Sequence, residues 1–218
     1  PNLGMLPGSR IGQLLSQELS IPVLMENDVN LGALGEQLRG VAEGASHIVF
    51  ISMGTGLGVA LIDEGRVVRG YSGGAGEVGS IRSHMMDSAE QRFLTFEEAL
   101  SGPSFSRRAE KVLSGRKAPS EIIDLAERGI HEAEQLVDDY LDALADLAVL
   151  LRSLADPEII VLGGGLGSNS GIVRRLKATL DGRGFEVPVQ KSTLGQDAAL
   201  IGARGLWEQR ALQEEAVR

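Results

Sequence analysis

The sequence predicts an α/β fold, and two observations support this. Short apolar runs of the kind typical of buried strands alternate with longer stretches whose apolar residues recur at helical spacing. Several of the apolar runs end directly at polar or glycine-rich segments, and the ends of strands are where open α/β sheets bind ligands. We therefore expect a helix-covered sheet with candidate binding residues at its strand ends.

Composition restricts the classes of function. The chain has 218 residues, 43% of them hydrophobic, no cysteine and a net charge of −9. The absence of cysteine excludes disulfides, thiolate catalysis and cysteine zinc sites, and the negative charge argues against a face that binds nucleic acid. No apolar run reaches the roughly 18 residues of a membrane span, and we expect no signal peptide. We expect a cytoplasmic protein that does not contact membranes.

The first part of the chain is expected to alternate helix and strand. Residues 9–20 read as a helix capped by Ser9, and residues 22–26 as a buried strand. A helix follows from Asp28, with its apolar stripe at Leu31, Leu34, Leu38 and Val41. Residues 47–68 read as three antiparallel strands joined by a glycine turn and a DEG turn.

The second part begins with one long predicted helix, from Ile130 to Leu154, whose apolar residues follow helical spacing. A buried strand ending in glycines follows at 157–163, then a helix containing Val173, Leu176 and Leu180, a strand near 185–190 and a last helix from about Ala198. Residues 83–91 and 114–120 are the candidate linkers, and both are too short to suggest a second independent domain.

The segment MENDVN, residues 25–30, follows a predicted strand. Its position places Asn27 and Asp28 at the mouth of a crevice at the end of the sheet. Asp28 has an alternative role as a helix N-cap, which contributes about 0.5–2 kcal/mol.

Two glycine segments are candidate phosphate sites. In GTGLG, residues 54–58, Gly54 and Gly56 let backbone amides approach an anion while Thr55 adds a hydroxyl donor. In GGGLG, Gly163, Gly164 and Gly165 lie between a strand and a helix, an arrangement that presents backbone amides to a nucleotide. A tight turn without a ligand is the alternative for the first segment.

The stretch GYSGGAGEVGSIRSH, residues 70–84, has little side chain to pack and holds Glu77 between glycines. A carboxylate accepts two donors at once, so Glu77 suits the hydroxyl groups of a sugar. A solvated glutamate in a surface loop is the alternative.

The order of these motifs resembles the ROK family of sugar kinases and sugar-responsive transcriptional repressors. The stretches that carry the resemblance are ENDVNLGALGE, ISMGTGLGVALIDEGRVVRG, GGAGEVG, FEEALSGPSF, IIVLGGGLG and LGQDAALIGAR. The resemblance implies an actin-like ATPase, ribonuclease H-like fold of two lobes with sugar in the cleft between them. Residues 1–46 would be the remainder of the small lobe, and residues 47–218 the large lobe with its C-terminal helix.

The resemblance also assigns roles residue by residue. Asn27, Asp28, Glu77 and Glu97 would bind sugar, with Asp28 at the position of the catalytic base. Gly54, Thr55 and Gly56 match the second phosphate loop, and Gly163, Gly164 and Gly165 match the glycines on the adenosine side.

Three departures from the family pattern concern phosphate and metal. The first phosphate loop of the family's kinases lies upstream of the END segment and has no counterpart in this sequence. Ser80 stands where the family often has a histidine that binds both sugar and zinc, and we keep Ser80 as a candidate sugar contact. The zinc cysteines are absent, and His84 alone does not make a metal site. We expect no bound zinc.

Two functions therefore compete. The first, which the missing zinc residues favour, is the sugar-sensing and dimerising part of a ROK transcriptional regulator, a homodimer that contacts DNA only through an upstream segment outside this chain. The alternative is a fragment of an ATP-dependent hexose kinase, similar to glucokinase, which would use ATP and Mg²⁺; otherwise no cofactor is expected. A cleft that no longer binds sugar is a third possibility. With one phosphate loop, we expect no sugar phosphorylation by this chain.

Overall fold

The computed structural model describes residues 8–87 and 90–216. Its strands are β1 (Ile48–Met53), β2 (Leu57–Asp63), β3 (Arg66–Val67), β4 (Arg82–Asp87), β5 (Arg92–Thr95), β6 (Ile159–Gly163) and β7 (Val189–Lys191). Its helices are α1 (Gly8–Leu19), α2 (Asp28–Arg39), α3 (Phe96–Leu100), α4 (Gly102–Glu110), α5 (Pro119–Glu127), α6 (His131–Ala155), α7 (Gly164–Gly167), α8 (Ser170–Asp181) and α9 (Ala198–Ala216). Residues 78–80 and 195–197 form short 3₁₀ turns.

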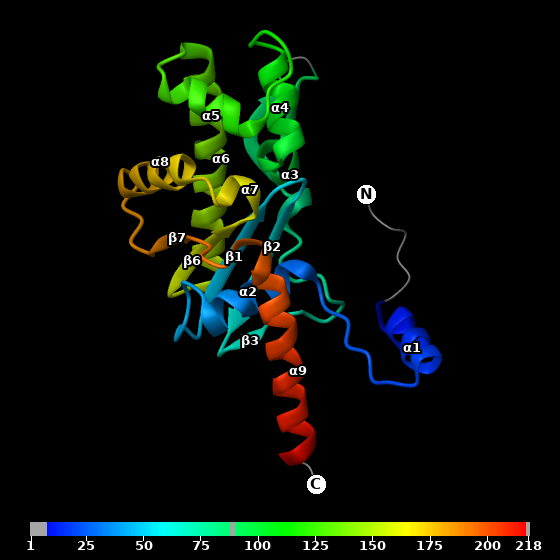
Figure 1. The fold of residues 1–218 in the computed structure, drawn as a ribbon. Coiled ribbons are helices and arrows are strands. Elements are labelled where there is room, and N and C mark those ends of the chain that lie inside the picture. The colour runs from blue at the N-terminus through cyan, green and yellow to red at the C-terminus, as the bar shows by residue number, and fades with distance from the viewer. Residues whose placement is uncertain (1–7, 88–89, 217–218) are drawn as a thin grey trace.

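A five-stranded mixed sheet forms the centre of the molecule (Figure 1). Its strand order is β3-β2-β1-β6-β7. The first three strands are antiparallel, as the sequence predicts for residues 47–68, whereas β6 and β7 run parallel to β1. The parallel strands end at one edge of the sheet, which brings the turn after β1 beside the glycines after β6.

The two faces of the sheet bury two separate hydrophobic clusters. Along β1, Val49, Ile51 and Met53 join the cluster that contains α6, whereas Ile48 and Phe50 join the cluster that contains α2. This alternation follows from the strand's period of two, because successive side chains point to opposite faces. The sheet is therefore the middle layer of three, with α6 on one side and α2 and α9 on the other (Figure 1).

Helix α6 has the predicted length, shifted by one residue along the chain, and carries the largest buried aromatic residue, Tyr140. The Tyr140 hydroxyl donates to the carbonyl oxygen of Leu100 at 3.1 Å and lies 3.2 Å from the sulfur of Met53. Burial raises the pKa of Tyr140, which keeps the hydroxyl protonated as a donor. Tyr140 thus connects α6 to the ends of α3 and β1.

Helices α2 and α9 pack with their backbones in direct contact. A methyl group on Gly35 would lie 2.0 Å from the carbonyl oxygen of Ala198, and one on Gly202 would lie 1.9 Å from that of Leu31. Only glycine permits such an approach. The contact holds α2, which begins at the END segment, against the C-terminal helix.

Two predictions near the N-terminus are wrong. Ser9 lies inside α1 rather than at its cap, because the helix already includes Gly8. Residues 22–26 form no strand, since no other strand lies beside them in the part of the chain that the structure describes. In Figure 1, α1 and the segment after it project away from the sheet, and Leu14, Leu19 and Ile21 are exposed there.

Three further expectations change in detail. The candidate linker at 83–91 is mostly part of the β4–β5 hairpin, with residues 88–89 outside the described residues. The strand expected at 185–190 forms later, as β7, and is shorter than predicted. The division into lobes at residue 46 stays a prediction, although α2 packs on the sheet of the expected large lobe. Within residues 8–87 and 90–216, no helix is long and apolar enough to span a membrane.

Changing Gly202 to alanine should destabilise the protein by about 1–3 kcal/mol, because the new methyl group forces two helix backbones apart. Urea denaturation of the variant measures this loss. Gly182→Ala is the matched control: its methyl group would lie 3.5 Å from the carbonyl oxygen of Ala178, an ordinary contact, so it should be neutral or slightly stabilising. Equal stability of the two variants would contradict the described helix contact.

Tyr140→Phe should cost about 1–3 kcal/mol of unfolding free energy, since the buried carbonyl of Leu100 loses its donor. The same hydroxyl removal at Tyr71, which is fully exposed, should change stability by less than about 0.5 kcal/mol. Chemical denaturation of both variants makes the comparison, and similar losses at the two sites would show that the Tyr140 bond does not stabilise the fold.

Candidate functional site

A polar cavity of about 330 Å³ lies at the edge of the sheet where β1 ends. Three segments far apart in the sequence form its walls: the start of α2, the turn between β1 and β2, and the glycine loop before residue 78. Of the residues singled out from the sequence, it is lined by Asn27, Asp28, Gly54, Thr55, Gly56 and Glu77. The fold thus brings together most of the predicted site.

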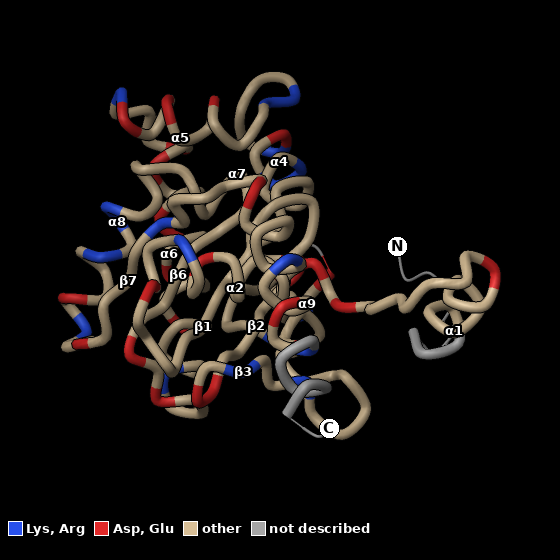
Figure 2. Tube along the Cα trace, turned by 60° about the horizontal axis from the view of Figure 1, so that its bottom comes forward, with Lys and Arg blue, Asp and Glu red and all other residues tan. Residues whose placement is uncertain are grey.

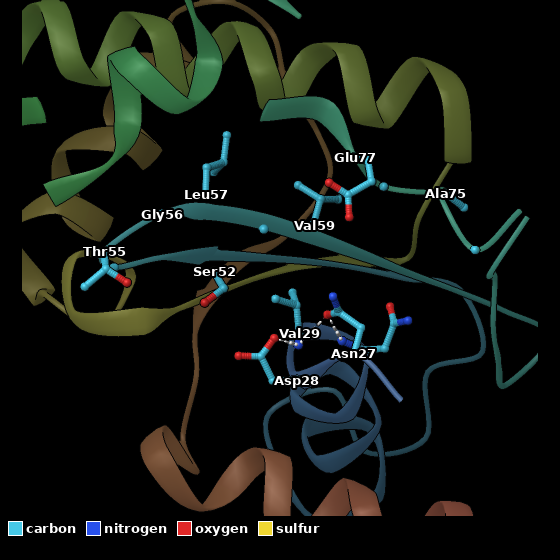
Figure 3. A pocket seen from close by; sticks show the side chains of 15 residues that line it. Asn27, Asp28, Val29, Ser52, Thr55, Gly56, Leu57, Val59, Ala75 and Glu77 are labelled. Atoms are coloured by element: carbon cyan, nitrogen blue, oxygen red, sulfur yellow. Dashed lines mark hydrogen bonds between the residues drawn. The ribbon is translucent and has the colours of Figure 1, made fainter. Parts of the chain in front are cut away.

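The N-cap of α2 is Asn27, which corrects the alternative role considered for Asp28. The Asn27 side chain accepts hydrogen bonds from the amides of Val29 at 2.8 Å and Asn30 at 3.4 Å. Asp28 is the first helical residue, and its carboxylate accepts from the Val29 amide at 2.9 Å. Because Asn27 caps the helix, the second carboxylate oxygen of Asp28 remains available in the cavity (Figure 3).

The turn between β1 and β2 presents Thr55 at one end of the cavity (Figure 3). The amide of Gly54 donates to the carbonyl of Gly56 at 3.0 Å, and the carbonyl of Gly54 accepts from the amide of Gly102 at 2.8 Å. The second bond attaches the turn to the start of α4. Thr55 is exposed at the tip, where its hydroxyl is accessible to a ligand.

Glu77 faces the start of α2 from the opposite wall (Figure 3). The glycine loop reaches this position because Gly76 has a φ of +85° and lies so close to β2 that a methyl group would be 2.2 Å from the carbonyl of Val59. A residue with a side chain fits neither condition. Gly76 therefore lets the loop lie against the strand and present Glu77 to the cavity.

Two predicted contacts lie beside this cavity rather than in its lining. A methyl group on Gly79 would be 3.0 Å from a carboxylate oxygen of Glu97, and one on Gly56 would be 3.4 Å from the other, so Glu97 lies between the turn and the glycine loop. Ser80 is exposed in the 3₁₀ turn and is absent from the described lining. Glu97 adjoins the site, whereas the structure does not place Ser80 in it.

Two more cavities adjoin the first. One of about 520 Å³ is bordered by Asp28, Ser52, Gly164 and Gly165, and one of about 440 Å³ by Thr55, Gly165 and Arg116. Gly164 has a φ of +75° and lies against the carbonyl of Met53, which lets the turn after β6 approach the end of β1. Gly163 packs on Phe50 and borders none of these three cavities.

Acidic groups dominate the first cavity. Asp28 and Glu77 are its charged lining residues, and Lys and Arg are absent from that lining among the described residues. Along the chain, basic and acidic residues are interspersed (Figure 2). Within the described ranges no group of three or more His, Cys, Asp or Glu could hold a metal ion. The expectation that zinc is not bound stays a prediction.

Helix α3, which carries Glu97, is fixed by its neighbour Glu98. Glu98 accepts a hydrogen bond from the Thr95 amide at 2.8 Å, and the Thr95 hydroxyl accepts one from the Glu98 amide, which forms a capping box. Arg92 on β5 donates two hydrogen bonds to the same carboxylate. The Arg92 bonds and the Thr95 amide lower the pKa of Glu98 to about 2.

Sequence reasoning missed the buried carboxylate of Glu36. It is fully buried in α2 and accepts hydrogen bonds from the Ser192 hydroxyl and from the amides of Leu194 and Val41. The predicted apolar stripe gives no signal for it, because Glu36 lies two residues after Leu34 and therefore on the opposite side of the predicted helix.

The family is identified by comparison with known proteins. A model of the ROK family matches residues 1–210. A glucokinase from Halalkalibacterium halodurans is 28% identical over 223 residues, which covers 89% of this chain and 66% of that protein. The chain thus spans less than two thirds of the length of that relative.

Solved structures share the fold. A ROK hexokinase from Thermus thermophilus has a TM-score of 0.75 at 30% identity, covering 88% of this chain and 67% of that one. A ROK family transcriptional regulator, a homolog of the E. coli MLC protein, has a TM-score of 0.73 at 21% identity, covering 88% and 53%. At that identity, the second likeness shows the fold alone.

Acid should remove the stabilisation that Glu98 provides. Because its pKa is lowered in the folded state, the ionised carboxylate stabilises the fold above about pH 4.5, and this contribution is lost as the pH falls toward 2. Wild type should therefore be more stable than Glu98→Gln at neutral pH, and the difference should shrink through that window. Denaturation at several pH values measures it.

Arg92→Met provides the control, since it removes the main cause of the lowered pKa. In this variant, the titration of Glu98 followed by NMR should move toward the ordinary range. A difference between wild type and Glu98→Gln that stays constant from neutral pH to pH 2 would contradict the role of the charge.

Proposed function

The chain belongs to the ROK family and has the actin-like ATPase fold, and on that premise we propose that it forms the sugar-binding and nucleotide-side part of a sugar kinase cleft. The sequence alone favours a transcriptional regulator, and this kinase function is the alternative to it. Two of the compared proteins are similar enough in sequence to indicate more than a shared fold, and both are sugar kinases: the glucokinase and the hexokinase.

The observation that carries the proposal is the position of Asp28 between two cavities. Its carboxylate borders both the polar cavity with Asn27 and Glu77 and the larger cavity with Gly164 and Gly165. A kinase requires a base at the junction between the hydroxyl that attacks and the phosphate that moves. A sensor requires only the first cavity.

Each residue has a role in this proposal. Glu77 and the side-chain amide of Asn27 bind sugar hydroxyls in the first cavity, and Asp28 accepts the proton of the attacking hydroxyl. Thr55 and the amides of the β1–β2 turn donate to phosphate oxygens, where they stabilise developing charge. ATP with Mg²⁺ would supply the phosphoryl group and neutralise its charge. In this proposal it would bind in the larger of the adjoining cavities, which Gly164 and Gly165 border.

The sensor remains the second candidate, because the absence of the family's zinc-binding histidine and cysteines favours a regulator. Its homodimer, its upstream DNA-binding segment and its cytoplasmic location stay predictions. The two functions differ in one property of this chain: the kinase needs a nucleotide beside the sugar, whereas the sensor does not.

Calorimetry on the 218-residue chain should show that it binds both an uncharged hexose and an ATP analogue with Mg²⁺. Glucose, mannose and N-acetylmannosamine form the sugar panel, and AMPPNP is the nucleotide. Asp28→Ala and Glu77→Gln should each weaken sugar binding by about tenfold or more, since each loses a hydrogen bond to a charged group.

Glu132→Gln, an exposed change on the first turn of α6, is the matched control and should leave both affinities unchanged. Sugar binding without nucleotide binding would overturn the kinase and leave the sensor. Nucleotide binding without any sugar from the panel would overturn the assignment of the first cavity.

A further inference from the structure

Glu26 and Arg69 connect the two walls of the polar cavity. Glu26 precedes Asn27, and its side chain is only 7% exposed. One carboxylate oxygen accepts from the side chain of Arg69 on the other wall, with its Nε at 2.7 Å and its Nη2 at 2.5 Å. Because both Arg69 donors go to this one oxygen, the second oxygen of the carboxylate is left to accept from other groups.

The other oxygen of Glu26 orders the start of α2. It accepts from the Asn27 amide at 3.0 Å and from the Asn30 side-chain amide at 2.8 Å. Both partners border the polar cavity, and Asp28 lies between them in the chain. One nearly buried carboxylate therefore sets the geometry of the wall that carries Asp28.

Arg69 fixes the base of the glycine loop in the same way. It lies two residues after the end of β3, and its carbonyl oxygen accepts from the Ala75 amide at 3.1 Å, which closes the loop. Ala75 and Gly76 line the cavity and lead into Glu77. The backbone of Arg69 closes the loop, while its side chain ties the closed loop to the segment that carries Asp28.

We propose that Glu26 and Arg69 are a positioning pair that holds Glu77 at a fixed separation from Asp28, and so sets the affinity of the cavity for its sugar. The part that concerns affinity rests on the proposed function. Neither residue is required to touch the sugar: Glu26 already has donors on both oxygens, and neither residue is part of the described lining.

A double-mutant cycle with two readouts tests the pair. Glu26→Gln, Arg69→Met and the double variant are compared by amide hydrogen exchange and by sugar calorimetry. The reporter is the Ala75 amide, and the reference is the Val68 amide, which donates to the Leu61 carbonyl outside the loop. Glu208→Gln and Arg204→Met, which break an exposed ion pair on α9, are the matched controls.

Each single variant should speed exchange at Ala75 by about tenfold, with Val68 unchanged, because the loop opens locally. Sugar affinity should fall by about tenfold to a hundredfold, as expected when binding groups are misplaced. The double variant should lose little more than either single variant, since one interaction is removed in all three. The control variants should change neither readout.

Unchanged exchange at Ala75 in both single variants would overturn the pair. Faster exchange with unchanged sugar affinity would overturn its positioning role. If wild type binds no sugar at all, the proposed function fails, while faster exchange at Ala75 still supports the structural link. A general loss of melting temperature with faster exchange at Val68 would identify a global effect and count against the proposal.

Discussion

The buried carboxylate of Glu36 fixes helix α2, and the whole cleft depends on the position of that helix. A buried charge is costly unless donors surround it, and here a hydroxyl and two amides do so. The Val41 amide lies just beyond the end of α2, whereas the Ser192 hydroxyl and the Leu194 amide belong to the loop after β7, whose Gly195 and Gln196 border the same cavity as Asp28. One anchor therefore relates the wall at the start of α2 to the wall formed by this distant loop.

Hydrogen bonds and ion pairs occupy the region where the family resemblance implies zinc. In the β4–β5 hairpin, the Ser83 hydroxyl donates to the Leu94 carbonyl, and His84 contacts Asp146 on α6 at 2.5 Å. Arg92 extends the same set of contacts to Glu98 on α3. The hairpin is thus joined to both α6 and α3, so Glu97 is supported by side-chain contacts that need no metal ligand.

Local patterns in the sequence were sufficient for the long helix and the antiparallel strands, whereas the meeting of Asp28, Thr55 and Glu77 was expected only from the family resemblance. Local patterns were insufficient where the outcome depends on a partner far away in the chain. Among the described residues, no strand lies beside the apolar run at 22–26. Asn27 rather than Asp28 caps α2, and a sequence pattern does not distinguish between two adjacent capping side chains. The links of Glu36 to Ser192 and of Glu26 to Arg69 are long-range, and no spacing rule encodes them.

The contact between α2 and α9 has a consequence for the order of folding. Gly35 and Gly202 belong to helices near opposite ends of the chain, so their packing closes a loop that includes the entire sheet. Contacts of this kind form late, because the entropy of closing a long loop opposes them until the intervening elements are in place. During synthesis the strands and α6 emerge before α9 does. We therefore expect Asn27 and Asp28 to reach their final positions only after α9 has been made.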